Sequence, residues 1–189
     1  RLVVTAGAWA AGLLAGLGVP LTVRRKHLHW YAAGPAWRAD AGCPCFFFER
    51  PEGLFYGFPE YGIAGVKVAE HTGGVTVDDP IGDPRVVDDT DRARIEAFTA
   101  ACLPGVSATP VAHGVCFYTM TPDEHFIVDR HPDHPNVVFA AGLSGHGFKF
   151  APLIGEHLVE VIAGRMAADD FQRWISGQPG AMQDAAPAS

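Results

Sequence analysis

The sequence of 189 residues has few cysteines, no paired CxxC motif and no long apolar run. Its four cysteines are Cys43, Cys45, Cys102 and Cys116. A disulfide framework is not indicated in a chain with this much apolar material, so we expect a reducing, cytoplasmic setting. No uninterrupted stretch of about 18 apolar residues occurs, so no membrane span is predicted.

The chain also lacks an excess of positive charge. It carries 14 lysines and arginines against 21 acidic residues, for a net charge of -7. Nucleic-acid binders usually concentrate basic residues on one face, and the short run 24–26 is too small for that, so no nucleic-acid partner is expected. Hydrophobic residues make up 48% of the chain, which is enough to build the core of one ordinary domain or two small ones.

The apolar and turn patterns predict an α+β fold, with antiparallel strands in the middle of the chain and strand–helix units at both ends. Thr90 is the predicted N-cap of a helix expected at 91–102. Residues 34–44 are expected to form a loop and residues 72–89 an exposed connection, because both are rich in turn-forming residues. Helices are predicted at 10–17, 91–102 and 153–162, and strands at 1–5, 21–33, 45–49, 53–58, 65–71, 113–120, 126–129 and 137–141.

A glycine-rich turn follows the predicted strand 137–141. Gly142, Gly145 and Gly147 lie within six positions, and a helical pattern begins after Pro152. Strand, glycine turn and helix start form an arrangement in which backbone N–H groups can face an anionic or electron-rich ligand. Such turns also occur simply to close packing, and the pattern alone leaves both interpretations open.

Several single residues are candidates for chemistry, each with an ordinary alternative. Lys67 lies within a strand and either points to solvent or is a desolvated cation with a function. Cys116 is either a small buried apolar residue or a reactive thiol. His146 lies between two glycines, which favours a cavity over a core position. Histidines 125, 131 and 134 lack matching acidic residues, so no metal site is predicted.

Four motifs together resemble one enzyme family. They are YGFP at 56–59, GVKVAEH at 65–71, CFYTMTPDEHFIVDRHP at 116–132 and AAGLSGHGFKF at 140–150. Over about residues 2–162 the chain is similar to the C-terminal half of the monomeric sarcosine oxidase and N-methyltryptophan oxidase family. These are FAD-dependent amine oxidases of the glycine/D-amino-acid oxidase group. The resemblance implies oxidation of an N-methyl or secondary amino acid to an imine, with O2 reduced to H2O2.

The resemblance assigns roles to individual residues. Cys116 matches the cysteine that forms a thioether to the flavin, so the cofactor is expected to be covalent FAD. Lys67 matches the catalytic lysine that assists the reaction with O2, and His71 matches a histidine near it. Lys149 matches a lysine that binds the substrate carboxylate. Tyr56 and His146 would line the amine pocket, and Gly7, Trp9, Gly145, Gly147, Phe148 and Lys149 would contact the flavin.

The sequence departs from the family in one respect, because it contains no GxGxxG fingerprint for the FAD pyrophosphate. We therefore expect a C-terminal portion whose partner is an N-terminal FAD-binding half, and weak or no FAD binding by this chain alone. Residues 1–19 and 107–165 would belong to the FAD-binding domain, 20–106 to the substrate domain and 177–189 to a disordered tail. The alternatives are a non-catalytic or truncated remnant and a related flavin-dependent amino- or imino-acid dehydrogenase.

Overall fold

The computed structural model describes residues 1–168 and 171, so the predicted tail at 177–189 lies outside the described part of the chain. The chain divides into two compact units. The first unit comprises Arg1–Val23 and Tyr118–Ser189, and the second comprises Arg24–Phe117. No helix in the described residues is both long and apolar enough to cross a membrane.

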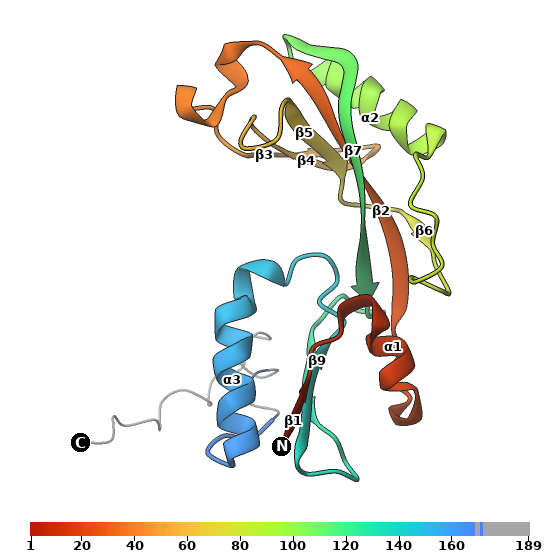
Figure 1. Cartoon of the computed structure of the whole chain (residues 1–189), viewed down its shortest axis with the longest axis vertical. Helices are drawn as coiled ribbons and strands as arrows, with labels where there is room; N and C mark the ends of the chain where they lie inside the picture. The colour runs from red at the N-terminus through yellow and green to blue at the C-terminus, as the bar shows by residue number, and fades with distance from the viewer. Residues whose placement is uncertain (169–170, 172–189) are drawn as a thin grey trace, which may run out of the picture. The chain divides into compact units, whose positions relative to one another are not determined.

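The first unit is a small sheet covered by helices. Its strands are β1 (Leu2–Val4), β8 (Ile127–Arg130) and β9 (Val137–Ala141), in the order β1-β9-β8. Strand β9 runs parallel to β1 and antiparallel to β8. Helix α3 (Ala151–Ala163) lies on one side of β9 and α1 (Ala10–Leu13) on the other, as Figure 1 shows.

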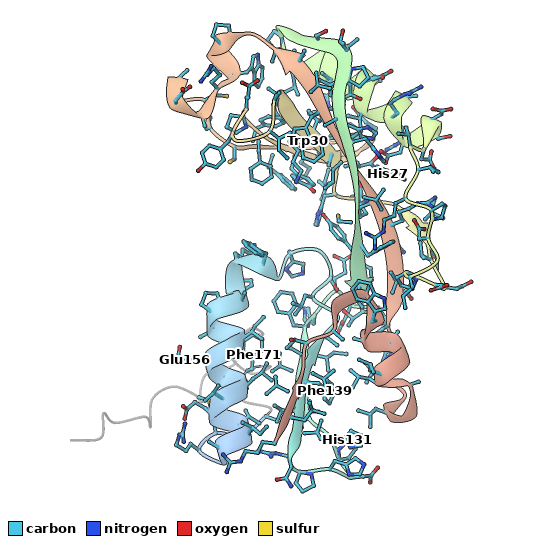
Figure 2. All side chains as sticks on the ribbon, in the orientation of Figure 1. His27, Trp30, His131, Phe139, Glu156 and Phe171 are labelled. Carbon is cyan, nitrogen blue, oxygen red and sulfur yellow. The ribbon has the colours of Figure 1, made fainter. Side chains whose placement is uncertain are left out.

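Strand alternation explains why both faces of β9 are covered. Val138 and Ala140 pack toward α3, where the buried side chains include Ile154 and Leu158. Phe139, which is labelled in Figure 2, and its neighbour Ala141 form the opposite cluster with residues of α1. All four consecutive residues from Val138 to Ala141 are buried, which is why this strand appears in the sequence as an uninterrupted apolar run.

The single helix predicted at 10–17 is wrong in detail. The segment forms a 3-10 turn (Gly7–Trp9), the short α1 and a second 3-10 turn (Ala15–Leu17). Glycines at positions 12 and 16 weaken a continuous helix, because glycine loses more backbone entropy than alanine on becoming helical. The predicted end at Gly18 is confirmed, since this residue has a left-handed φ of 64°.

The second unit is an antiparallel sheet with one helix. The strand order is β3-β4-β5-β2-β6, and β7 also pairs with β2. The unit boundaries fall within β2 and β7, each of which continues for a few residues into the first unit. The elements are β2 (Thr22–Ala33), β3 (Phe46–Arg50), β4 (Gly53–Phe58), β5 (Val66–Glu70), β6 (Val75–Thr76), α2 (Asp89–Cys102) and β7 (Val106–Met120).

Helix α2 covers one face of this sheet. Phe98 of α2 stacks on Phe55 of β4 with ring centroids 4.3 Å apart. Ile95, also of α2, is completely buried together with Tyr31 of β2 and Val66 of β5. Alternation along each strand therefore leaves the other face, with Trp30, Tyr56 and Lys67, directed away from α2.

The α+β fold and the hairpin between β3 and β4 are confirmed, while several boundaries differ from the prediction. The N-cap of α2 is Asp88, not Thr90, because the Asp88 carboxylate accepts hydrogen bonds from the backbone N–H groups of Thr90 and Asp91. Strand β7 begins at Val106 rather than at 113. The expected connection at 72–89 contains the two-residue β6, and the expected loop at 34–44 contains the 3-10 turns Pro35–Trp37 and Ala39–Ala41.

Candidate active site

Lys67 points into a group of aromatic rings on the open face of the second unit's sheet. It pairs across the strands with Trp30 of β2 and with Phe58 of β4. Its Nζ atom lies 5.7 Å from the centroid of the Trp30 ring, 5.7 Å from that of Tyr56 and 5.0 Å from that of Phe58. Trp30 is labelled on β2 in Figure 2. The Lys67 side chain is therefore half-buried among these rings, on the face that α2 does not cover.

The charge of Lys67 has no anionic partner in the described part of the chain, where no hydrogen bond or ion pair reaches it. Burial lowers the pKa of Lys67 below its ordinary value, and the nearby Cys116 thiol opposes this shift. Burial in turn raises the pKa of Cys116, while Lys67 and Lys26 act to lower it. The site therefore holds a partly desolvated cation beside a free thiol.

A cavity of about 380 Å³ opens beside Lys67. Lys67 contributes the one charged side chain among the residues that line it. Such a lining suits an apolar group carrying one electron-rich or negative end. The lining residues are Trp30, Ala39, Cys45, Phe58, Pro59, Tyr61, Ile63 and Lys67.

Tyr56 and His71 belong to the same face. Their rings lie edge to face with centroids 6.4 Å apart, and the backbone N–H of His71 donates to Leu54 O of β4. Tyr56 also contacts the Phe58 ring at a centroid distance of 6.1 Å. The second unit thus brings together four of the predicted site residues, namely Tyr56, Lys67, His71 and Cys116.

The glycine-rich turn of the first unit is fixed by close packing. A Cβ at Gly145, whose φ is +79°, would lie 2.3 Å from the Tyr118 ring, so only glycine fits there. Ser144 is buried in spite of its positive φ of 47°. Its hydroxyl donates to Gly142 O and accepts from the backbone N–H of Thr121. This hydrogen bonding holds the turn on the end of β7.

The other predicted site residues of this turn differ in how far they are buried. His146 packs on Phe126 with ring centroids 4.7 Å apart, and its Nε2 lies 3.1 Å from Glu124 O. Phe148 is 94% exposed. Lys149 is exposed as well, with its Nζ 5.3 Å from the Phe150 ring centroid. Lys149 lies in a 3-10 turn (Phe148–Phe150) before α3, and Gly147 is the buried N-cap of that turn.

Gly7 and Trp9 form the 3-10 turn after β1 in the first unit. Gly7 has a left-handed φ of 55°, and both residues are exposed while the intervening Ala8 is buried. The hydrogen bond from Trp9 N to Ala6 O closes the turn. These two residues are thus accessible on the side of the unit that α1 covers.

The sequence prediction missed Trp30, Phe58 and Lys26. Alternation along β2 places Lys26 and Trp30 on the same face, so a strand-by-strand assignment of faces would have found them. Lys26 is buried, and its Nζ donates to Thr72 O at 2.5 Å. Among the described residues, no group of three or more His, Cys, Asp or Glu side chains has a geometry that could hold a metal ion.

Comparison with known families now identifies the class. Residues 1–161 match the family model described as DAO, FAD dependent oxidoreductase. The chain belongs to this family. It is 40% identical over 165 residues to a monomeric sarcosine oxidase of Bacillus sp. (strain B-0618), covering 85% of this chain and 42% of the relative.

A second relative supports the same group. The N-methyl-L-tryptophan oxidase of Escherichia coli O139:H28 is 38% identical over 160 residues, which are 82% of this chain and 41% of the relative. The resemblance inferred from the four motifs is confirmed. The chain spans less than half the length of these relatives.

Solved structures show the same fold. NikD, described as an unusual amino acid oxidase, matches with a TM-score of 0.71 at 22% identity, over 92% of this chain and 47% of the NikD chain. A thermally stable mutant of fructosyl peptide oxidase matches with a TM-score of 0.73 at 22% identity, over 96% of this chain and 46% of the other. At this identity the match concerns the fold alone.

Proposed function

We propose that this chain supplies the flavin-facing and substrate-facing parts of an oxidase that converts an N-methyl or secondary amino acid to an imine. In this reaction O2 takes up the two electrons and two protons and leaves as H2O2, and water then hydrolyses the imine. One observation carries the proposal, namely the Lys67 ammonium held among three aromatic rings without an anionic partner in the described residues.

The residues of the second unit fit a flavin ring. Cys116 is a free, half-buried thiol next to two ammonium groups, which stabilise the thiolate needed for a thioether bond. The bound flavin would supply the hydride acceptor. Hydrogen-bond acceptors of the bound ring would give the Lys67 ammonium the partner that it lacks within the described chain.

Lys67 would serve the oxygen half of the reaction. A fixed positive charge in a site with little water stabilises the negative charge that develops when O2 accepts an electron. The aromatic rings around Nζ restrict water and keep the ammonium in place. His71 and Tyr56, on the same face, would orient the substrate amine next to it.

The first unit would contribute the remaining contacts. Lys149 is an exposed cation that can bind a substrate carboxylate, and His146 beside it would line the amine pocket. In this proposal the first unit is part of a FAD-binding domain and the second is the substrate domain. Flavin contacts are proposed for Gly7, Trp9, Gly145, Gly147, Phe148 and Lys149.

The substitution Lys67→Met tests the proposal in an assembly of this chain with a FAD-binding half, loaded with flavin. Methionine keeps the length of the side chain and removes the charge. We expect the rate of flavin reoxidation by O2 to fall by at least about a hundredfold, as for loss of one charge-stabilising group. The rate of flavin reduction by sarcosine should change much less. Stopped-flow absorbance measures the two rates separately.

The matched control is Lys149→Met, which removes an exposed cation of the same chemistry. We expect this variant to raise KM for the amino acid and to leave reoxidation by O2 unchanged. Equal loss of both half-reactions in Lys67→Met would contradict the role of Lys67. Reoxidation that stays fast in Lys67→Met would remove the main support for an oxidase.

A further inference from the structure

Three histidines meet between the sheet of the second unit and helix α2. His27 and His29 come from β2 and His113 from β7. The Nδ1 atom of His27 lies 3.0 Å from Nε2 of His113, and the ring centroids of His29 and His113 are 5.2 Å apart. On the helix side, His29 Nε2 lies 2.8 Å from Oδ1 of Asp91, in the first turn of α2.

The positions of these side chains follow from the strand. His27 and His29 are two residues apart on β2 and therefore face the same side, toward α2, while Trp30 faces the other side. Figure 2 labels His27 and Trp30 on this strand. The cluster is thus separate from the cavity beside Lys67, and its residues do not line it.

The hydrogen bond between Nδ1 of His27 and Nε2 of His113 requires that only one of these two nitrogens carries a proton. In the neutral pair one ring donates and the other accepts. If both rings are protonated, two N–H groups point at each other and the bond is lost. His27 is only 4% exposed, and its other nitrogen, Nε2, is buried without a hydrogen-bond partner in the structure. The protein therefore offers no second acceptor for an added proton on His27.

Most charged side chains around the three histidines already have a hydrogen-bond or ion-pair partner. From α2, Asp91 binds His29, and the Asp88 carboxylate before the helix is used as the N-cap. From β2, Arg25 is paired with Asp83 at 3.0 Å. Also between α2 and the sheet, Arg94 of α2, which is close to Asp91, pairs with Glu70 of β5 at 2.8 Å. Tyr31 of β2 lies there too, near Arg92 and Glu96 of α2.

We propose that His27, His29, His113 and Asp91 form a pH-responsive latch that fastens the start of α2 to β2 and β7 and opens on acidification. Protonation of both His27 and His113 breaks their hydrogen bond and places two cations beside a ring already bound to Asp91. The first turn of α2 then separates from the sheet. The residues of β2 from His29 to Tyr31 pair with β5 around Lys67, so opening also disturbs the strand pairing behind that lysine.

The direction of the pH effect follows from burial. Burial lowers the pKa of His27 and that of His113, with Asp91 opposing both shifts. Below about pH 6.5, the ordinary histidine value, the opened form therefore binds more protons than the closed form. The latch contributes its full stability above that pH and loses it as the pH falls through the lowered pKa values. The opening constant should rise about tenfold per pH unit for each linked proton.

Hydrogen exchange of the full chain tests the proposal. Amide exchange in the first turn of α2, corrected for intrinsic rates, would be followed between pH 7.5 and 5.0. We expect protection there to fall by about tenfold per pH unit or more below about pH 6.5. The amides of β9 in the first unit, a strand without histidine, should not show this dependence. Pulsed exchange with mass spectrometry provides the measurement.

Two variants sharpen the test. His113→Gln keeps a hydrogen-bonding side chain that cannot be protonated, and should flatten the pH dependence at α2. His134→Gln is the control, because His134 is exposed and its ring also lies close to another histidine ring, with centroids 4.6 Å apart. It should retain the dependence seen in the unmodified chain.

Direct titration of the imidazole rings by NMR decides the matter even if His113→Gln fails to fold. Ring signals of His27 and His113 that titrate below about pH 6.5, together with acid-induced exchange at α2, support the latch. Titration at or above the ordinary value overturns it. Protection at α2 that is independent of pH in the unmodified chain overturns it as well.

Discussion

At the scale of single residues, Cys116 shows how burial and charge oppose each other at one thiol. Burial raises its pKa and keeps it protonated, while the ammonium groups of Lys67 and Lys26 favour the thiolate. The net result is a raised pKa, and the two lysines limit the rise. Cys102 is also half-buried, and it lies on α2 and packs against the core of the second unit.

The proposed thioether between Cys116 and flavin is tested by Cys116→Ala, which should abolish covalent attachment if the proposal is right. In an assembly of this chain with a FAD-binding half, we expect the unmodified chain to keep flavin fluorescence after acid precipitation and denaturing electrophoresis. The variant should release all of its flavin under the same conditions, because alanine cannot form a thioether.

Cys102→Ala is the matched control for this test. It removes a half-buried thiol of the same unit that lies on α2 rather than on β7. Attachment should persist in it. Flavin that stays bound to Cys116→Ala after denaturation would contradict the assignment.

Residue-level prediction from the sequence depended on the motifs, and it stopped where the orientation of a side chain mattered. The sequence predicted the strand that contains Lys67, but alternation alone could not say which face of that strand a helix covers. That depends on α2 covering the side of Val66 and Val68, a contact between segments far apart in the chain. The partners Trp30 and Phe58 arrive through strand pairing, which no single motif records.

At the scale of elements, helix α2 depends on its first turn. The Asp88 carboxylate accepts hydrogen bonds of 2.9 and 3.0 Å from the N–H groups of Thr90 and Asp91. The sequence pointed to Thr90 because threonine is also a common N-cap. The helix begins earlier than expected, since an acidic side chain two residues upstream reaches both free N–H groups.

Substitution separates the two assignments. Asp88→Ala should lower the free energy of unfolding by about 1 kcal/mol, the usual cost of losing a capping side chain. Thr90→Ala should have a much smaller effect, because the Thr90 side chain lies inside the helix at an exposed position. Urea unfolding followed by circular dichroism measures both. A larger loss for Thr90→Ala would restore the cap expected from the sequence.

At the scale of the whole chain, the two units have separate cores. Phe98 packs in the second unit between α2 and the sheet, and Phe139 packs in the first between β9 and α1. The sequence predicted the α+β class and most of the strands, because their apolar runs and turns are local. It placed the division at the starts of the two long strands, after residues 19 and 106, whereas the two compact units divide inside β2 and β7.

Shortening a core side chain should destabilise the unit that contains it more than the other unit. Phe98→Ala is expected to cost about 3–5 kcal/mol, as for other buried phenylalanines, and to reduce amide protection in β4 and β5. Phe139→Ala should reduce protection in β1 and β9 instead. Hydrogen exchange read element by element distinguishes the two variants. Equal loss of protection throughout the chain in both would show that the units unfold as one.

The pairing of β1 with β9 also has a consequence for the order of folding. Val3 pairs with Val138, so the first unit needs residues from two distant segments before its sheet can form. The second unit is one continuous segment, Arg24–Phe117. Chain closure over long separations slows folding, and contiguous segments can fold while synthesis continues. On the ribosome, we expect the sheet that carries Lys67 to form first, with β1 unpaired until β9 has emerged.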